Sequence, residues 1–147
     1  GETRALETIL TTAVLRSDLD WVRALLDVRT DLRLLNCLPA AEREDTLVGH
    51  LRGGTAKPWA LVPLLRDMPR PWGRPLADAV LEQITAKNGG QLATMLADTL
   101  PAALPPEAAE RARRLLEHSD EDAARRRVLR DAVQYQSFRQ SLTEAFQ

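Results

Sequence analysis

The stretch that decides the fold is KPWALVPLLRDMPRPWGRPLADAVLEQI, which runs from Lys57 to Ile84. Pro58 suits the first turn of a helix, because the first helical residue needs no N–H partner. Apolar residues follow at near-helical spacing as far as Leu65. Pro69 and Pro71 then stop this helix, because each disfavours the α region in the residue before it. The stretch therefore begins with a short apolar helix that ends in a proline-rich turn.

A longer amphipathic helix is predicted after the turn. Its apolar residues are spaced i, i+3, i+4 and i+8, which places them on one face of an α-helix. We expect the helix to end at Asn88-Gly89-Gly90, since glycine just past the last turn is a common helix ending. One hairpin of this kind cannot bury both of its apolar faces, so it needs neighbours of the same kind. The residues of the apolar face are Leu76, Ala79, Val80 and Ile84.

Length and composition indicate one soluble all-helical domain over residues 1–147. The chain is 44% hydrophobic and 28% charged, which is usual for a globular domain. Leucine and alanine dominate, while β-branched and aromatic residues are few, and this favours helix over sheet. Arginine greatly outnumbers lysine, as in GC-rich bacterial genomes. The chain begins Gly1-Glu2 and enters a predicted helix at once, so we expect it to be the C-terminal part of a longer protein.

Charge and cysteine content exclude several classes of partner and site. The net charge is -1, with ten basic and ten acidic residues in 1–73 and ten and eleven in 74–147. Such an even balance gives no strong field for nucleic acid or anionic lipid, so we expect neither as a partner. Cys37 is the only cysteine, which excludes an intrachain disulfide and fits a cytoplasmic location. No apolar run reaches the length of a membrane span.

The remaining segments predict further helices with their own start and stop signals. Asp18 and either Thr30 or Asp31 are candidate N-caps, since short polar side chains there accept a backbone N–H bond. The last helix has Ser119 as its candidate cap. The expected helices cover 3–16, a segment from Leu19, a short piece around Leu32–Leu35, a segment from Pro39 to Gly53-Gly54, a short helix over 92–100 that stops before Pro101, a segment from Pro105-Pro106, and the C-terminal segment that holds Val128, Ala132, Tyr135, Phe138, Leu142 and Phe146 on one side.

A weak repeat connects these segments. Leu38-Pro39, Met68-Pro69 and Leu100-Pro101 each end a short apolar helix before a longer one, at intervals of 30 and 32 residues. Such a period is typical of stacked helical hairpins of the HEAT or armadillo kind. We therefore predict an all-α fold of stacked antiparallel helical hairpins, either a HEAT-like α-solenoid or an irregular helical bundle.

No residues in the sequence make a recognisable catalytic, cofactor or metal site. The two histidines, His50 and His118, are far apart, whereas a zinc site needs three or four clustered ligands. Residues 53–57 lack the spacing of a phosphate-binding loop and have no strand before them. The carboxylates gather at predicted helix starts, where capping and the helix dipole explain them. We predict no catalytic residue, no cofactor and no metal, and hence a protein that is not an enzyme.

The densest basic run comprises Arg125, Arg126, Arg127 and Arg130, and it follows three acidic residues in 120–122. Acid followed by base on one helix is self-stabilising, so a solvated face is the simplest interpretation. The alternative is a basic edge that binds an acidic partner.

Tryptophans are the second set of candidate interaction residues. Trp21, Trp59 and Trp72 all lie near predicted helix starts. There they can fill the junctions between hairpins, and Trp59 and Trp72 are also candidates for an exposed aromatic hot spot in a protein interface.

Three patterns carry a resemblance to a known family. They are W…LL…(L/M)P, PW-x-x-x-L-A-x-A-V-L from Pro71, and the closing helix from Phe138 to Phe146 with its Phe-x7-Phe spacing. Through them, residues from about 18 to 147 resemble uncharacterised bacterial helical proteins encoded near MoxR-type AAA+ ATPases and von Willebrand A proteins. The resemblance implies an α-helical repeat scaffold that works with ATPase partners, and it implies no catalytic residues.

The expected function is accordingly a non-catalytic protein–protein interaction scaffold in a bacterial cytoplasmic complex linked to an ATPase. Its expected partner is a protein, either an AAA+ ATPase or a von Willebrand A protein. Two alternatives stay open. One is a helical ligand-binding or enzyme domain whose site is dispersed in the sequence. The other is weak nucleic-acid binding through the arginine-rich region from Arg111 to Arg139, which steep salt dependence of binding would reveal.

Overall fold

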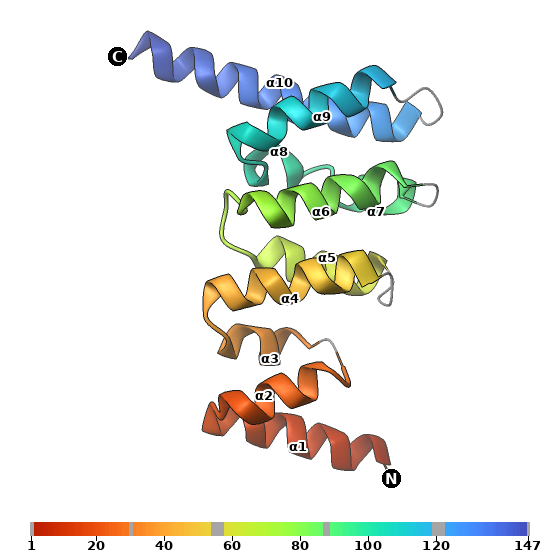
Figure 1. Cartoon of the computed structure of the whole chain (residues 1–147), viewed down its shortest axis with the longest axis vertical. Coiled ribbons are helices and arrows are strands. Elements are labelled where there is room, and N and C mark those ends of the chain that lie inside the picture. Colours follow the sequence, from red (N-terminus) through yellow and green to blue (C-terminus); the bar gives the residue numbers. More distant parts are fainter. Residues whose placement is uncertain (1, 30, 54–57, 87–88, 119–122, 147) are drawn as a thin grey trace. The chain divides into compact units, whose positions relative to one another are not determined.

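All regular structure in the described part of the chain is helical, which confirms the prediction of an all-α fold (Figure 1). The computed structural model describes residues 2–29, 31–53, 58–86, 89–118 and 123–146. None of the helices in these ranges combines the length and hydrophobicity needed to cross a membrane. The helices are α1 (Glu2–Arg16), α2 (Leu19–Leu26), α3 (Leu32–Cys37), α4 (Ala40–Gly53), α5 (Pro58–Asp67), α6 (Arg74–Thr85), α7 (Gly90–Met95), α8 (Leu100–Ala103), α9 (Pro106–His118) and α10 (Ala123–Ala145).

The chain divides into two compact units, an N-terminal unit (Gly1–Thr46) and a C-terminal unit (Leu47–Gln147). The boundary falls within α4. In the N-terminal unit, α1, α2 and α3 all pack against one another. Each contributes leucine, valine or alanine side chains that lose their contact with water, which is the main favourable term in folding. The buried apolar residues of this unit are Leu10, Ala13, Val22, Leu26, Leu34, Leu35 and Leu38.

Two predicted caps hold the helix starts of the N-terminal unit. The Asp18 carboxylate accepts a bond from the backbone N–H of Trp21 (3.4 Å), and the Asp31 carboxylate accepts one from that of Arg33 (2.9 Å). Both aspartates have extended backbone at the N-cap position, as the capping geometry requires. Both predictions are confirmed.

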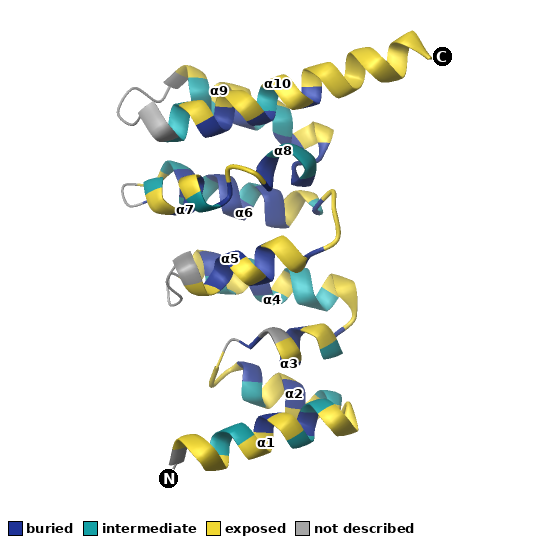
Figure 2. Ribbon diagram, turned by 180° about the vertical axis from the view of Figure 1, so that it is seen from behind, coloured by how far each residue is buried: buried dark blue, intermediate teal, exposed yellow. Residues whose placement is uncertain are grey.

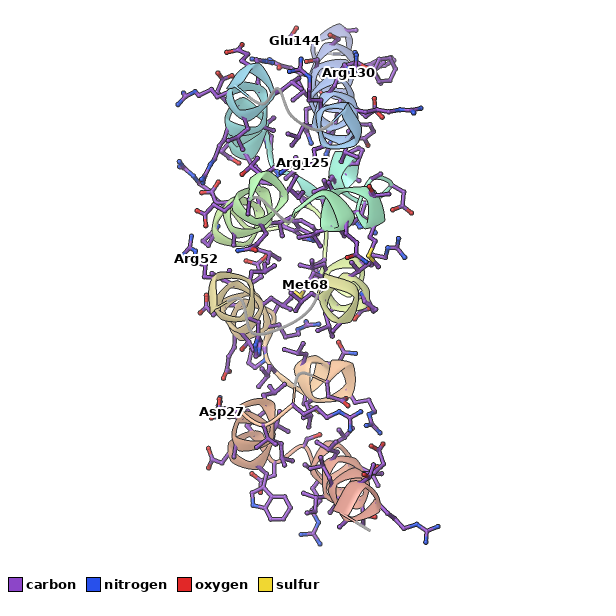
Figure 3. All side chains as sticks on the ribbon, turned by 90° about the vertical axis from the view of Figure 1, so that its right-hand side faces the viewer. Asp27, Arg52, Met68, Arg125, Arg130 and Glu144 are labelled. Carbon is purple, nitrogen blue, oxygen red and sulfur yellow. The ribbon has the colours of Figure 1, made fainter. Side chains whose placement is uncertain are left out.

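The C-terminal unit is built from two layers of helices. Along one layer α6 packs against α9, and along the other α5 packs against α7 and α7 against α10, with α8 also packed on α10. Figure 3 looks along these helices and shows the two columns side by side. Each hairpin therefore covers the apolar faces of the next, as the repeat predicts.

Trp72 lies at a junction between helices of the C-terminal unit. Its side chain is only 1% exposed, and its backbone N–H donates to the Ala103 carbonyl at 2.7 Å, which ties the turn before α6 to the end of α8. For Trp72 the junction interpretation is confirmed. Trp21, in the N-terminal unit, is half-exposed, so that interpretation is wrong for it. The side chain of Trp59 lies outside the described residues.

Two predicted helix ends are wrong. The amphipathic helix ends at Thr85 and not at 88–90, because Ala86 already leaves the helical conformation and its N–H closes the last turn on the Gln83 and Glu82 carbonyls. Gly90 instead begins α7, and Asn88 lies outside the described residues. The helix predicted over 92–100 ends at Met95, and Pro101 lies in the first turn of α8. Proline is well suited to that position because its missing N–H is not needed there. The predicted cap at Ser119 is also outside the described residues.

Gly89 makes the return from α6 to α7 possible. A Cβ atom at this position would collide with the carbonyl oxygens of Gln83 and Ile84 in the last turn of α6. Both are backbone atoms, so no flexible side chain can move aside. The chain can approach this closely only because glycine has no Cβ.

We therefore expect Gly89→Ala to lower the free energy of unfolding by about 1–3 kcal/mol, the usual cost of forcing an atom into packed structure. The matched control is Gly49→Ala in α4, where an added Cβ meets no atom within 4 Å. This control should raise stability by roughly 0.5–1 kcal/mol, because alanine is the better helix former. Urea unfolding followed by circular dichroism measures both. Equal effects in the two variants would contradict the close approach at Gly89.

Candidate protein-interaction surface

Helix α10 changes its surroundings halfway along. In its first half Val128, Leu129 and Ala132 are buried, and the last buried side chain is that of Gln136. Every side chain from residue 137 to residue 146 is exposed, and Figure 2 shows this half of α10 in the colour of exposed residues. The second half of the helix therefore contributes almost nothing to the core of the C-terminal unit.

The exposed half nevertheless keeps the apolar pattern of a packed helix. Tyr135, Phe138, Leu142 and Phe146 are spaced i, i+3, i+7 and i+11, so they form one line along the helix, here called the apolar stripe. Phe138 is 63% exposed and Phe146 is 87% exposed. Single exposed apolar residues are normal on a protein surface. A line of three large aromatic residues and a leucine is a contiguous patch, and such patches mark interaction sites.

The predicted arginine run separates into two groups. The Arg125 side chain is half-buried, and its Nη1 donates to the carbonyls of Ile84 (3.2 Å) and Ala86 (2.7 Å). Arg125 reaches between the two layers (Figure 3) and neutralises the negative end of the α6 dipole. Arg126 is also half-buried. Arg127 and Arg130 are exposed and make no ion pair within the described part of the chain.

Among the predicted aromatic candidates, Trp72 is buried in the C-terminal unit, so its ring cannot meet a partner at the surface. Its indole nitrogen is buried without a hydrogen-bond partner among the described residues. Since the side chain of Trp59 is outside the described residues, the accessible predicted candidates are Arg127 and Arg130.

A groove runs along α10 on the side next to α9, here called the α9–α10 groove, with a volume of about 410 Å³. Its size lies within the range of ligand sites in proteins. One wall comes from the turn before α6 and from α9, and comprises Pro71, Pro106, Ala109, Glu110 and Arg113. The other wall comes from α10, and comprises Gln136, Ser137, Arg139, Gln140 and Thr143.

The polar groups of the α9–α10 groove differ in how far they are already satisfied. The Gln136 side chain is 9% exposed, and its Nε2 donates to the carbonyls of Pro101 (3.1 Å) and Leu104 (2.6 Å). Arg113 pairs with Glu110 at 2.8 Å. Arg139 makes no side-chain hydrogen bond or ion pair within the described residues. Arg139 is thus the uncompensated charge of the groove.

Sequence reasoning did not find the groove residues. Pro71, Arg113 and Arg139 come from three separate segments of the chain, the turn before α6, α9 and α10. The one sequence signal that could have indicated the groove is a set of polar residues at 136, 140 and 143. Their spacing of i, i+4 and i+7 places them on one face of a helix, beside the apolar stripe.

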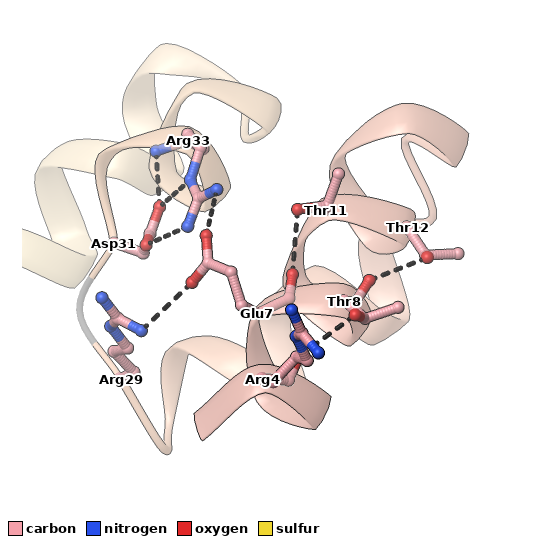
Figure 4. Close-up of polar contacts among 8 residues, drawn as sticks. All are labelled: Arg4, Glu7, Thr8, Thr11, Thr12, Arg29, Asp31 and Arg33. Carbon is pink, nitrogen blue, oxygen red and sulfur yellow. Dashed lines mark hydrogen bonds and ion pairs between the residues drawn. The ribbon is translucent and has the colours of Figure 1, made fainter. Parts of the chain in front are cut away.

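The densest network of charged side chains lies in the N-terminal unit (Figure 4). Arg33 pairs with Glu7 of α1 at 2.7 Å and with Asp31 at 3.0 Å, and Arg29 reaches Glu7 at 3.5 Å. The network thereby links α1 to the start of α3. All its charges have partners, so it has the features of a structural cluster and not of a reactive one.

Both carboxylates of this cluster are held in their charged form. Side-chain hydrogen bonds from Arg33 lower the pKa of Asp31 below its ordinary value of 3.8, against the opposing effect of burial. Hydrogen bonding to Arg33 likewise lowers the pKa of Glu7 below 4.5. The pKa of Arg33 is raised, first by its bonds to Asp31 and then by those to Glu7. Within the described residues, no three His, Cys, Asp or Glu side chains are grouped so that they could hold a metal ion.

Comparison with known proteins places the chain in one family. Residues 2–146 match the model of the Family of unknown function (DUF5691), and because the match covers nearly all of the chain, the chain belongs to this family. No protein of curated function and no solved structure matches it.

The charged cluster gives a pH-dependent prediction. A carboxylate whose folded-state pKa is lowered contributes stability that is complete above its ordinary pKa and is lost as pH falls through the folded-state value. We expect Asp31→Asn to lower stability at neutral pH by about 1 kcal/mol, since the pair is partly exposed, while the N-cap is kept because asparagine also caps helices. The gap between wild type and variant should close as pH falls below about 3.8.

The matched control is Asp20→Asn, which removes a carboxylate whose side chain is 95% exposed and which pairs with Arg23 only at 3.5 Å. It should change stability little at any pH. Urea unfolding at a series of pH values measures the free energy of unfolding of wild type, Asp31→Asn and Asp20→Asn. A constant gap between wild type and Asp31→Asn down to strongly acid pH would contradict the account of the Asp31 carboxylate.

Proposed function

We propose that the chain is a non-catalytic protein-interaction scaffold of a bacterial cytoplasmic complex, and that its partner covers the apolar stripe of α10. The observation that carries this proposal is the exposure of Tyr135, Phe138, Leu142 and Phe146 along one line of a helix. Exposed aromatic side chains lower the solubility of a protein, and they supply a large contact area to a partner. Helices bearing such a line commonly pack against another amphipathic helix.

The outer surface of α9 gives a useful contrast. There Glu110 pairs with Arg113 (2.8 Å) and Arg114 (3.8 Å), so these three charges compensate one another. A polar outer face of this kind keeps the end of a helical stack soluble. The apolar stripe of α10 is not a polar face of this kind. This difference supports a binding role for α10 in particular.

The charges around the stripe favour an acidic partner. Arg127 and Arg130 precede the stripe on α10, and neither has an ion pair in the described part of the chain. Helix α10 contains fewer acidic residues, Asp131 and Glu144, than arginines. An amphipathic helix with acidic residues beside its apolar face would match this arrangement.

The identity of the partner is proposed from the sequence resemblance. The helical proteins that this chain resembles are encoded near MoxR-type AAA+ ATPases and von Willebrand A proteins. Proteins of these two classes are therefore the partners to seek first, in an ATPase-linked complex of the cytoplasm.

The first test compares Phe138→Asp with wild type as bait in the native lysate, at two salt concentrations and with nuclease treatment. Removing a central aromatic residue from an interface commonly costs about 2 kcal/mol, or roughly 30-fold in affinity. We expect Phe138→Asp to lose the captured ATPase or von Willebrand A protein. Leu15→Asp is the matched control, because Leu15 is also a helical apolar residue and is 80% exposed. Equal capture by both variants, or capture abolished by nuclease, would contradict the proposal.

The second test concerns the charge of the partner. Arg130→Glu should weaken binding several-fold at low salt and much less at high salt, because exposed charges are screened by ions. The matched control is Arg4→Glu, which reverses an exposed arginine of α1. Titration of the partner by fluorescence anisotropy measures both. Stronger binding by Arg130→Glu would show that the partner is basic and would overturn the charge argument.

A further inference from the structure

The α9–α10 groove and the apolar stripe involve different residues of the same helix. The groove is contacted by Gln136, Arg139 and Gln140, whereas the stripe contains Phe138 and Leu142. The α10 wall of the groove consists of polar side chains and carries the uncompensated charge of Arg139. Its ligand must therefore differ in chemistry from a partner that covers the stripe.

The length of the groove limits what can bind. One wall includes residues 106–113 of α9 and the other includes residues 136–143 of α10. Eight residues of α-helix extend for about 12 Å. An extended peptide rises about 3.3 Å per residue, so roughly four peptide residues would fill this length.

Gln136 is the best-fixed polar group of the groove. Its Nε2 donates to the carbonyls of Pro101 and Leu104, so both amide hydrogens are in use and the orientation of the amide is determined. The Oε1 atom is left to accept a hydrogen bond, and Gln136 lines the groove. An acceptor held in this way suits the backbone N–H of an extended peptide.

Arg139 supplies the charge. It lines the groove from α10 without an ion pair in the described residues, whereas Arg113 on the opposite wall is already compensated by Glu110. A free guanidinium has five N–H donors and binds a carboxylate in a fork-like geometry. The groove therefore combines one acceptor for a peptide backbone with one cation for a carboxylate about a helical turn away.

We propose that the α9–α10 groove binds a short extended peptide segment through the Gln136 Oε1 atom, with an aspartate or glutamate side chain of that segment paired to Arg139. Small apolar surfaces at Pro71, Pro106 and Ala109 accommodate the neighbouring residues of the peptide. This site is separate from the apolar stripe, and it binds its segment whether or not a partner covers the stripe.

The test is an NMR titration of the ¹⁵N-labelled chain with two capped pentapeptides, Ala-Val-Glu-Val-Ala and its Gln counterpart, at millimolar concentration. We expect the Glu peptide to shift the side-chain amide signals of Gln136 and the Nε–H signal of Arg139. The Gln peptide should bind about tenfold more weakly, because it lacks the charge-assisted bond.

Variants separate the contribution of Arg139 from effects on the fold. Arg139→Gln should bring the affinity for the Glu peptide down to that for the Gln peptide, and Arg139→Lys should restore part of the difference. Arg127→Gln is the matched control, since Arg127 is exposed on α10 but does not line the groove. It should leave both affinities unchanged. Phe138→Ala, which adds no charge beside Arg139, should also bind the peptide normally, which distinguishes this site from the stripe.

Three results would overturn the proposal. Sodium acetate that produces the same shifts at the same concentration as the Glu peptide would identify a site for small carboxylates only. Equal affinity for the two peptides would exclude the pairing with Arg139. Shifts that are absent from the groove, or that fall on the stripe instead, would exclude the groove as a peptide site.

Discussion

The structure depends on one constraint, which is that an amphipathic helical hairpin can bury its second apolar face only against another hairpin. Helix α6 shows the constraint fully met, because it is packed against both α7 and α9. Its buried residues surround most of the helix and comprise Leu76, Ala77, Ala79, Val80, Leu81 and Ile84. Trp72 fills the junction just before it. In α10 the same constraint is met only as far as Gln136, and the apolar pattern continues for another ten residues in water.

The second half of α10 consequently has two different surfaces. The apolar stripe would gain most from a partner with an apolar face of its own, while the α9–α10 groove presents fixed polar groups and the free charge of Arg139. Polar contacts give orientation and specificity, and apolar contacts give most of the binding free energy. A surface that places the two side by side on one helix suits recognition of a protein.

Much of the fold could be predicted from the sequence because its determinants are local. The helices, the caps at Asp18 and Asp31 and the start of α5 at Pro58 all follow from residues within one turn of each other. Periodicity could not reveal that Phe138 is exposed while Val128 is buried, because both belong to the same apolar pattern and differ only in their neighbours. Arg125 was placed in a basic run, yet it caps α6, some forty residues away in the sequence. The groove was missed for the same reason, since its walls come from distant segments.

The measurement that tests the central claim most directly is hydroxyl-radical footprinting of the apolar stripe, in the purified chain and in intact cells. If a protein covers the stripe, Phe138 and Phe146 should be oxidised readily in the purified chain and protected in cells. Leu15 should be labelled in both settings, since it is 80% exposed and lies outside the stripe. Equal oxidation of Phe138 in the purified chain and in cells would contradict the account, because it would mean that this surface stays in contact with water where the protein works.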